Sequence, residues 1–186
     1  GTRICYNFIH DVQCYHYGGS GVYPDEGTSF VRYEGNVAYN TVSGGFQMNY
    51  GADNEGENNS FALPRDEQVV LSQFKLYTPC RTFQRNIVYW KHGPLLGAAQ
   101  HDPATQGDFD QNLYWRTDGQ EPDMDGAPLT TWQAQGLDKN SIPANPLFSD
   151  PEHGRFTLRA DSPARQIGFR PIDTSAAGPR EDVLST

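Results

Sequence analysis

The segment NIVYW, residues 86–90, decides the fold of this chain, because similar segments recur along the sequence as far as residue 116. Each copy is a polar residue, usually Asn, followed by apolar residues. The copies are RICYN (3–7), NVAYN (36–40), NSFAL (59–63), NIVYW (86–90) and NLYW (112–115), with first residues 33, 23, 27 and 26 positions apart. A repeat of this length predicts a stack of similar structural units.

Each unit also contains a Gly-rich turn and a second apolar run. These second runs are SGVY (20–23), GFQM (45–48) and QVVLS (68–72). Two short β-rich runs per unit favour stacked strands, so we expect an all-β, right-handed parallel β-helix whose apolar side chains stack from coil to coil. Asn is suited to the turns, because it tolerates left-handed backbone angles and can hydrogen-bond to its copies in neighbouring coils.

The repeat defines two regions. Residues 1–116 should form the coils, and the Pro-, Asp- and Gly-rich residues 117–186 should form an irregular cap and tail. One short helix is expected in PLTTWQAQG (128–136), where proline suits the first turn. The first copy has no capping segment before it, so we expect the coils to be the C-terminal part of a longer solenoid. N-terminal coils of the same parent protein, or another chain, would then cover residues 1–10.

Charge and composition exclude several classes of partner. A net charge of −9 provides no basic patch for nucleic acid or for an anionic membrane surface, and no apolar run reaches membrane-spanning length. DMDG (123–126) lacks the later bidentate acid of a calcium loop, so we expect no metal and no cofactor. The three cysteines favour small buried side chains, with a Cys5–Cys14 bridge as the alternative in a secreted protein.

Several phrases resemble a known superfamily. NFIHDV, GGSGVYPDEG, RNIVYW and ANPLFSDPEHGRFTLRADSPA are similar to the C-terminal half of secreted bacterial, pectate-lyase-like parallel β-helix proteins. YPDEG together with RNIVYW resembles a glycoside hydrolase family of this fold with α-L-fucosidase and xylanase members. The resemblance implies a secreted, periplasmic or cell-surface protein that acts on a polysaccharide or oligosaccharide.

The same resemblance implies two catalytic carboxylates. The best matches are Asp25 in YPDEG and Asp66 in LPRDEQ, although the family often has Glu at the second position and His in place of Asn49. Glu26 and Glu67 are the substitutes. A polysaccharide lyase, or a non-catalytic carbohydrate-binding or structural β-helix, are the alternatives.

The spacing of these acids can be examined from the repeat. Adjacent residues of an extended chain point to opposite sides, so Asp25 and Glu26 do not form a pair. Aligning SGVYPDEG with GGFQMNYG puts Asp25 beside Asn49 in the next coil. Asp66 should then lie two coils from Asp25, near the opposite end of that strand, compatible with the roughly 6.5–9.5 Å of an inverting glycosidase or with no pairing.

Six residues are candidates for substrate binding. Aromatic rings stack on sugars, and histidines in turns after strands can reach sugar hydroxyls. The candidates are Tyr23, Asn49, Tyr50, His16, His92 and Trp90. Trp90 and Trp115 are similarly placed in their repeats, so a ladder of stacked aromatics is an equal alternative for them.

Overall fold

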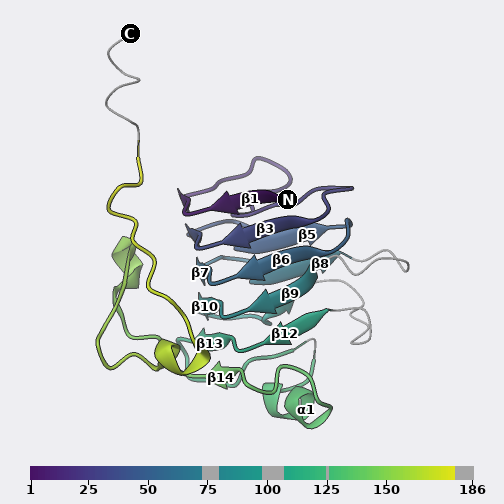
Figure 1. Cartoon of the computed structure of the whole chain (residues 1–186). Coiled ribbons are helices and arrows are strands. Elements are labelled where there is room, and N and C mark those ends of the chain that lie inside the picture. The colour runs from purple at the N-terminus through teal and green to yellow at the C-terminus, as the bar shows by residue number, and fades with distance from the viewer. Residues whose placement is uncertain (73–79, 98–106, 125, 179–186) are drawn as a thin grey trace.

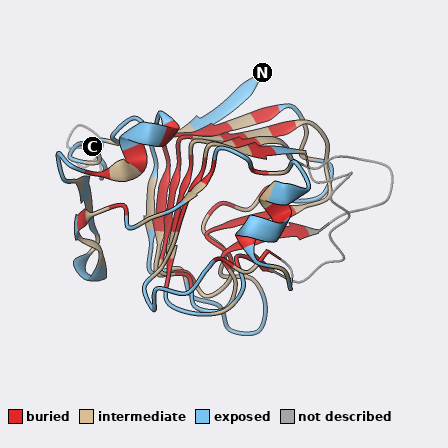
Figure 2. Cartoon of the chain, turned by 90° about the horizontal axis from the view of Figure 1, so that it is seen from below, coloured by how far each residue is buried: buried red, intermediate tan, exposed pale blue. Residues whose placement is uncertain are grey.

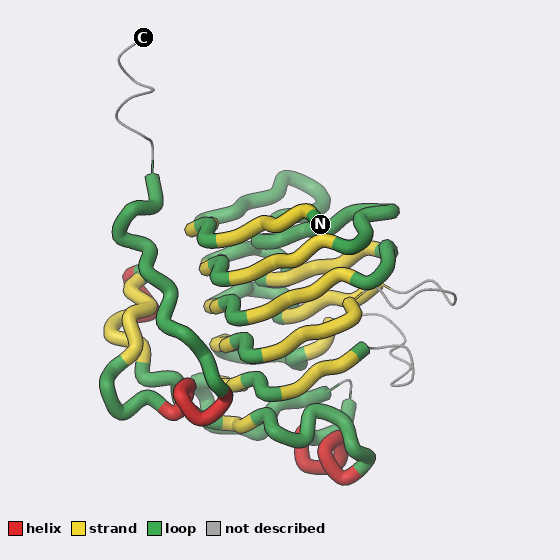
Figure 3. Tube along the Cα trace, in the orientation of Figure 1, coloured by secondary structure: helices red, strands yellow, loops and turns green. Residues whose placement is uncertain are grey.

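The chain forms a parallel β-helix of about five coils, as the computed structural model of residues 1–72, 80–97, 107–124 and 126–178 shows (Figure 1). This confirms the predicted all-β, parallel fold. The coils lie one above another, with the N-terminus at one end of the stack (Figure 3). Among the described residues, no helix has the length and apolar character needed to span a membrane.

Three parallel sheets form the walls of the stack. Sheet A contains β1 (Thr2–Cys5), β3 (Val31–Glu34), β6 (Asn54–Glu57), β9 (Cys80–Gln84) and β12 (Asp108–Asp110). Sheet B contains β2 (Phe8–His10), β4 (Val37–Tyr39), β7 (Ser60–Ala62), β10 (Ile87–Trp90), β13 (Leu113–Arg116) and β14 (Ile142–Pro143). Sheet C contains β5 (Phe46–Asn49), β8 (Val69–Ser72) and β11 (Leu96–Gly97), and Val22 of the first coil bridges to Phe46.

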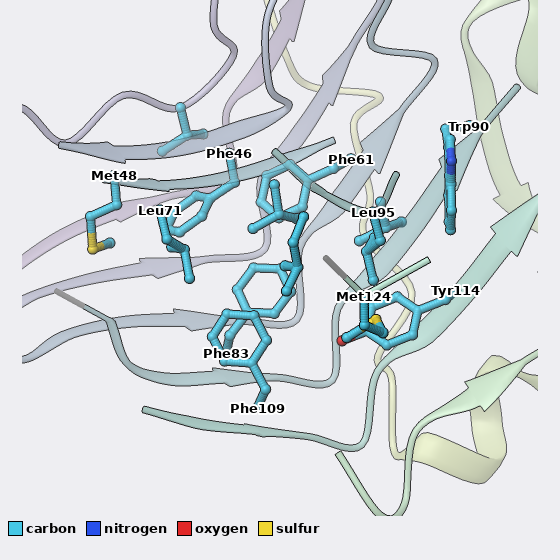
Figure 4. Packing of buried hydrophobic residues seen from close by; sticks show 14 of the residues in the cluster. Phe46, Met48, Phe61, Leu71, Phe83, Trp90, Leu95, Phe109, Tyr114 and Met124 are labelled. Atoms are coloured by element: carbon cyan, nitrogen blue, oxygen red, sulfur yellow. The ribbon is translucent and has the colours of Figure 1, made fainter. Parts of the chain in front are cut away.

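Apolar side chains from the three sheets meet inside the coils. Side chains alternate between the two faces of a strand, so every second position in each sheet points into the stack. Phe46, Phe61 and Phe83 come from different sheets and coils, and all three are completely buried. Their rings contact one another in the interior (Figure 4), and Phe83 stacks on Phe109 of the next coil with centroids 4.8 Å apart.

A ladder of asparagines runs through the corner between sheets A and B. From the second rung onward, the side-chain Oδ1 accepts hydrogen bonds from the backbone N–H and the Nδ2 of the rung before it, at 2.8–3.2 Å. The rungs are Asn7, Asn36, Asn59, Asn86 and Asn112, and Ser141 Oγ receives the last backbone N–H at 2.7 Å. The first rung is therefore Asn7, not Arg3 as the repeat suggested, because the structural repeat begins with NFI and not with RIC.

The left-handed backbone angles of this corner belong to the residues just before the rungs. Tyr6, Gly35, Asn58, Arg85 and Gln111 have φ between 53° and 67°. The expectation that the repeated asparagines themselves adopt left-handed angles is wrong at this corner. Their shared feature is the side-chain amide, buried in the four rungs from Asn36 to Asn112, which the sharp turn places along the axis of the stack.

Residues 117–143 close one end of the stack. The chain crosses the last coil in the short helix α1 (Leu129–Ala134) and then adds β14 to sheet B. Leu129, Trp132 and Met124 are buried against the interior of the coils. Figure 2 views the molecule from this end and shows that α1 has both buried and exposed positions. The predicted cap, with its single short helix, lies in this region.

Residues 144–178, called the strap here, do not belong to the end cap. The strap contains the hairpin of β15 (Phe148–Asp150) and β16 (Arg155–Leu158), joined by the 3-10 helix η2 (Pro151–His153), and a second 3-10 helix η3 (Pro163–Ile167). It runs back along the outside of the stack towards the N-terminal coil (Figure 1). The interpretation of residues 117–186 as one cap is thus wrong for the strap.

The strap is held by a second apolar layer and by polar contacts at the corner of sheets A and B. Phe156 contacts Tyr39 at a centroid distance of 5.1 Å, and Phe148 contacts Tyr89 at 5.8 Å. Asn58 donates from Nδ2 to the carbonyl oxygen of Arg170 at 2.9 Å and accepts the Arg170 N–H at 2.6 Å. The outer face of sheet B is therefore covered.

The cysteines do not follow the sequence expectation. Cys5 and Cys14 are free thiols in the structure, and Cys14 is exposed, so they are neither bridged nor both buried. The side chain of Cys80 lies outside the described residues.

We expect Asn86→Ala to lower the free energy of unfolding by about 3 to 5 kcal/mol. The substitution removes the acceptor for two donors of Asn59 and the donor to the Gly56 carbonyl, all of them buried. Urea denaturation measures the loss. Asn145→Ala, at an exposed position with one local hydrogen bond, is the control and should cost less than about 1 kcal/mol. Equal losses in the two variants would contradict a stabilising role for the ladder.

Candidate functional site

Asp25 and Asn49 meet on the outer face of sheet C, as the alignment of the second runs predicts. The bridge between Val22 and Phe46 sets the register, which puts residue 25 beside residue 49 in the next coil. Asn49 donates from Nδ2 to Asp25 Oδ1 at 3.0 Å, and the backbone N–H of Glu26 donates to the same oxygen at 2.8 Å. These hydrogen bonds, that of Asn49 first, hold the pKa of Asp25 below its ordinary value.

Two tyrosines lie beside this carboxylate. The hydroxyl groups of Tyr17 and Tyr23 are 3.0 Å apart, and Tyr17 is 75% exposed. The hydrogen bond with Tyr17 and then partial burial raise the pKa of Tyr23, and the Asp25 carboxylate adds to this effect. We call Tyr17, Tyr23, Asp25 and Asn49 the sheet C cluster. It combines two phenols, an ionised carboxylate and an amide on one exposed surface.

Three other candidate residues lie near this cluster in the chain. His16 is exposed and packs against Tyr15 edge to face, at a centroid distance of 4.2 Å, one residue before Tyr17. Tyr50 follows Asn49 directly, in a left-handed conformation with φ of 56°. Glu26 is exposed, and its backbone N–H, as noted above, bonds to Asp25.

The structure does not bring Asp66 to Asp25. Val69 pairs with Phe46, so Asp66 aligns three positions before the start of β5, whereas Asp25 aligns with Asn49 at its end. The length of β5 alone separates the two alignment points by about 10 Å. The prediction that Asp25 and Asp66 act as acid and base on one bond is therefore wrong, because the two residues lie at opposite ends of β5 and are too far apart along the sheet to form a pair.

Glu67 is also separated from Asp25 along sheet C. Its Oε2 accepts a hydrogen bond of 3.4 Å from the Ser43 hydroxyl, before the start of β5. Asp66 is exposed, and its backbone N–H donates to the Val42 carbonyl at 3.1 Å. The two acids thus occupy the corner between sheets B and C, away from the sheet C cluster.

Trp90 is a core residue. Its side chain is completely buried, and its Nε1 donates to the Gly93 carbonyl at 3.1 Å, so the prediction that it binds substrate is wrong. It also differs from Trp115, which pairs in register with Tyr89 and lies on the opposite face of sheet B. NIVYW has one residue more than NLYW between its Asn and its Trp, and a shift of one residue reverses the face of a strand.

His92 lines a pocket at the corner between sheets B and C, called the corner pocket here. The pocket has a volume of about 310 Å³. Lys91 donates to Glu152 of the strap at 2.9 Å, and Arg65 donates to Gln13 at 2.8 Å. The remaining lining residues are Asp11, Tyr39, Asn40, Leu63 and Pro64.

Sequence reasoning missed most of the corner pocket. Asp11, Asn40 and Leu63 each follow a ladder asparagine by four positions, and each has φ between 51° and 55°. Hydrogen bonds from His10 and then Asn40 keep the pKa of Asp11 low. The shared position of these three residues, four places after a ladder asparagine, could have identified this corner from the sequence. Glu152 lies in the strap, outside the repeat, so the sequence gives no indication that it belongs to the pocket.

Two glutamates on the outer face of sheet A, Glu34 and Glu57, form ion pairs with arginines. Glu34 is bound by Arg3 and by Arg170 of the strap, at 2.7 and 2.8 Å, and Glu57 is bound by Arg32 and Arg85. Burial disfavours ionisation of both glutamates, but the guanidinium groups outweigh it and keep each pKa below its ordinary value. This face is a structural ion-pair network that links adjacent coils and the strap.

The acidic loop at residues 118–126 makes local contacts. Asp118 pairs with Arg116 at 2.6 Å, and Asp123 accepts the backbone N–H of Gly126 at 2.6 Å. Asp125 lies outside the described residues. Across the parts of the chain that the structure describes, no group of three or more His, Cys, Asp or Glu side chains could hold a metal ion.

The pKa of Asp138 is strongly perturbed, but this carboxyl group is not at a surface site. The residue is 2% exposed, and burial raises its pKa to about 6, although hydrogen bonds from Ser141 and Tyr114 oppose the shift. The Tyr114 hydroxyl donates to it at 2.8 Å, and Ser141, the last acceptor of the ladder, donates to its other oxygen. Asp138 therefore fixes the closed end of the stack.

No family model, curated protein or solved structure matches the chain. The resemblance to pectate-lyase-like proteins and to glycoside hydrolases thus stays a prediction. The parallel β-helix itself rests on the observed sheets.

We expect Asp138 to make the protein less stable as the pH rises from 4 to 7. Its folded pKa of about 6 exceeds the ordinary 3.8, so the folded protein holds the proton more tightly in this interval, and stability falls until the pH passes the folded pKa. Relative to Asp138→Asn, the wild type should lose about 2 to 3 kcal/mol of unfolding free energy between pH 4 and pH 7. Urea denaturation of both proteins at each pH measures this. A difference that stays constant with pH would refute it.

Proposed function

We propose that this chain is a carbohydrate-binding β-helix, with the sheet C cluster as its sugar-binding surface. The observation that carries the proposal is the contact between Asp25 and Asn49 across two coils, flanked by the phenols of Tyr17 and Tyr23. An ionised carboxylate accepts hydrogen bonds from sugar hydroxyls, an amide donates to them, and aromatic rings pack on the C–H faces of sugars. These groups are what recognition of a neutral sugar requires.

Binding is favoured over hydrolysis at this cluster because the carboxylates are not paired across it. A glycosidase needs two carboxyl groups separated by roughly 5 to 9.5 Å on either side of the bond that is cleaved. Asp66 and Glu67 lie beyond the far end of β5, which leaves Asp25 without either expected partner. Location outside the cytoplasm, as the family resemblance implies, is part of the proposal.

The proposal predicts that Asp25→Asn and Tyr17→Ala each weaken glycan binding by about tenfold or more. The first change removes a charged acceptor and the second removes an exposed ring, and either loss is worth at least about 1.4 kcal/mol. A glycan array identifies the ligand, and titration calorimetry measures the affinity. Asp161→Asn, at an exposed acid of the strap, is the matched control and should bind like the wild type. Wild-type affinity in both cluster variants would overturn the proposal.

Hydrolysis at the corner pocket is a second candidate function. Two carboxylates from separate segments, Asp11 and Glu152, line this pocket together with Lys91 and His92. The low pKa of Asp11 keeps it ionised, as a base or nucleophile must be, and Glu152 is the second carboxyl group of the pocket. This proposal keeps the glycoside hydrolase implied by the resemblance but assigns other acids to it.

If the protein cleaves a glycan, Glu152→Gln and Asp11→Asn should each reduce kcat by about a hundredfold or more, because each removes one of the two required carboxyl groups. Asp161→Asn again serves as the control. Release of reducing sugar from the array ligand measures the rate. Turnover that survives both substitutions would exclude the corner pocket as the catalytic site, whether or not the sheet C cluster binds the sugar.

A further inference from the structure

A second group of polar side chains lies on the outer face of sheet C, next to the sheet C cluster. Gln47 is at its centre, two residues before Asn49 in β5. Both side chains point outwards, because residues alternate along a strand and Phe46 and Met48 point into the core. The two positions are about 7 Å apart along the strand. The Gln47 amide is therefore one step along β5 from the contact between Asn49 and Asp25.

One end of the Gln47 amide is held by hydroxyl groups, and the other end is free. Its Oε1 accepts a hydrogen bond from Ser20 of the coil before it and another, at 3.4 Å, from Ser43 of its own coil. No described residue accepts a hydrogen bond from its Nε2, and this atom is not one of those that are sealed from solvent without a partner. The side chain as a whole is only 9% exposed, so the fold fixes the amide and leaves one donor for a ligand.

Glu67 of the third coil completes the group. The Ser43 hydroxyl is 3.4 Å from Glu67 Oε2 and 3.4 Å from Gln47 Oε1, so the carboxylate and the amide are close enough to contact one sugar residue. Glu67 is partly exposed, and no residue in the described part of the chain donates to its Oε1. The carboxylate thus offers an acceptor beside the free donor of Gln47, and a sugar hydroxyl uses both.

This group and the sheet C cluster form one diagonal path across three coils. The path runs from Glu67 before the start of β5, through Gln47 in the middle, to Asp25 at the end. Tyr23 of the first coil aligns with Gln47 and offers a ring on which a sugar can pack. The path is at least as long as β5, about 10 Å, which exceeds the length of a single sugar residue.

We propose that sheet C binds a neutral oligosaccharide, with one sugar residue at Asp25 and Asn49 and the next at Gln47 and Glu67. This inference rests on the proposed function and specifies its ligand. At the second position, Gln47 Nε2 donates to a hydroxyl or ring oxygen, and Glu67 Oε1 accepts from a neighbouring hydroxyl. Glu67 in this role binds the sugar and takes no part in bond cleavage.

The charges along the path disfavour an acidic sugar. Asp25 and Glu67 are carboxylates, and the groups between them are amides, hydroxyls and phenols. Hydrogen bonds, that of Asn49 first, hold the pKa of Asp25 below its ordinary value, so this group is charged at neutral pH. A uronate or a sulfate would approach two negative charges, with no cation among these side chains to offset them. A neutral sugar meets no such repulsion.

The experiment uses the whole protein and neutral sugars of increasing length. The probes are the mono-, di- and trisaccharides of β-1,4-linked glucose, xylose, mannose and galactose, with trigalacturonate as the acidic comparison. Titration calorimetry measures the affinities, and NMR titration measures those that are weak. We expect at least one neutral trisaccharide to bind about tenfold or more tightly than its monosaccharide, because it occupies both positions. Trigalacturonate should bind more weakly than that trisaccharide.

Two isosteric variants test the second position. Gln47→Glu keeps an oxygen acceptor for Ser20 and Ser43 but removes the Nε2 donor, and Glu67→Gln keeps the acceptor for Ser43 but replaces the free oxygen by an amide nitrogen. Each should weaken trisaccharide binding by about tenfold, the equivalent of one hydrogen bond, and leave monosaccharide binding unchanged. Gln120→Glu, at an exposed position outside sheet C, is the matched control and should bind like the wild type.

Asp25→Asn separates this proposal from the proposed function, because it should weaken binding of sugars of every length. If Asp25→Asn does so while Gln47→Glu and Glu67→Gln, both folded by circular dichroism, keep the full trisaccharide affinity, this proposal alone is overturned. An affinity that does not rise with chain length, or tighter binding of trigalacturonate than of every neutral trisaccharide, also overturns it. Wild-type affinity in Asp25→Asn and Tyr17→Ala would overturn the proposed function and this proposal with it.

Discussion

The structure depends on how the chain satisfies backbone polar groups at the sharp corner between sheets A and B. A turn that is repeated in every coil buries N–H and C=O groups that neither sheet can pair, and an unpaired group of this kind costs about 1 to 3 kcal/mol. The asparagine ladder supplies one acceptor and one donor per coil at this corner. The residue before each rung takes the left-handed angles, which leaves the asparagine side chain to point along the stack.

The ladder also fixes the register of everything that follows it. Once successive asparagines are aligned, Ile87 pairs with Ser60 and Leu113, and each later position of sheet B is assigned to the inside or the outside. The interior column is filled by residues such as Phe61 and Val88, and the exterior column by Ile87 and Leu113. Sheet B is consequently apolar on both faces, so the strap must cover its outer face.

The three outer faces of the stack differ in what they offer a ligand. Sheet B is covered by the strap, and Glu34 and Glu57 of sheet A are neutralised by ion pairs with their arginines. Sheet C keeps an exposed carboxylate, an amide and phenols, which is why the proposed sugar site lies there. The corner pocket exists only because the strap returns to the first coils and brings Glu152 to Lys91.

The sequence by itself determined the coil, its repeat and the contact between Asp25 and Asn49, because each coil repeats a local pattern and neighbouring coils align in register. It also indicated the asparagines as the repeated element, although local similarity wrongly put Arg3 in place of Asn7. Only the tertiary structure decided which face Trp90 takes, how far Asp66 lies from Asp25, and where the strap runs. The face of Trp90 depends on its spacing from the ladder asparagine, which is one residue longer than that of Trp115 and has a meaning only once the register of the coils is known. The other two depend on the offset between turns and on contacts such as that of Arg170 with Glu34, 136 positions apart, which a short segment does not encode.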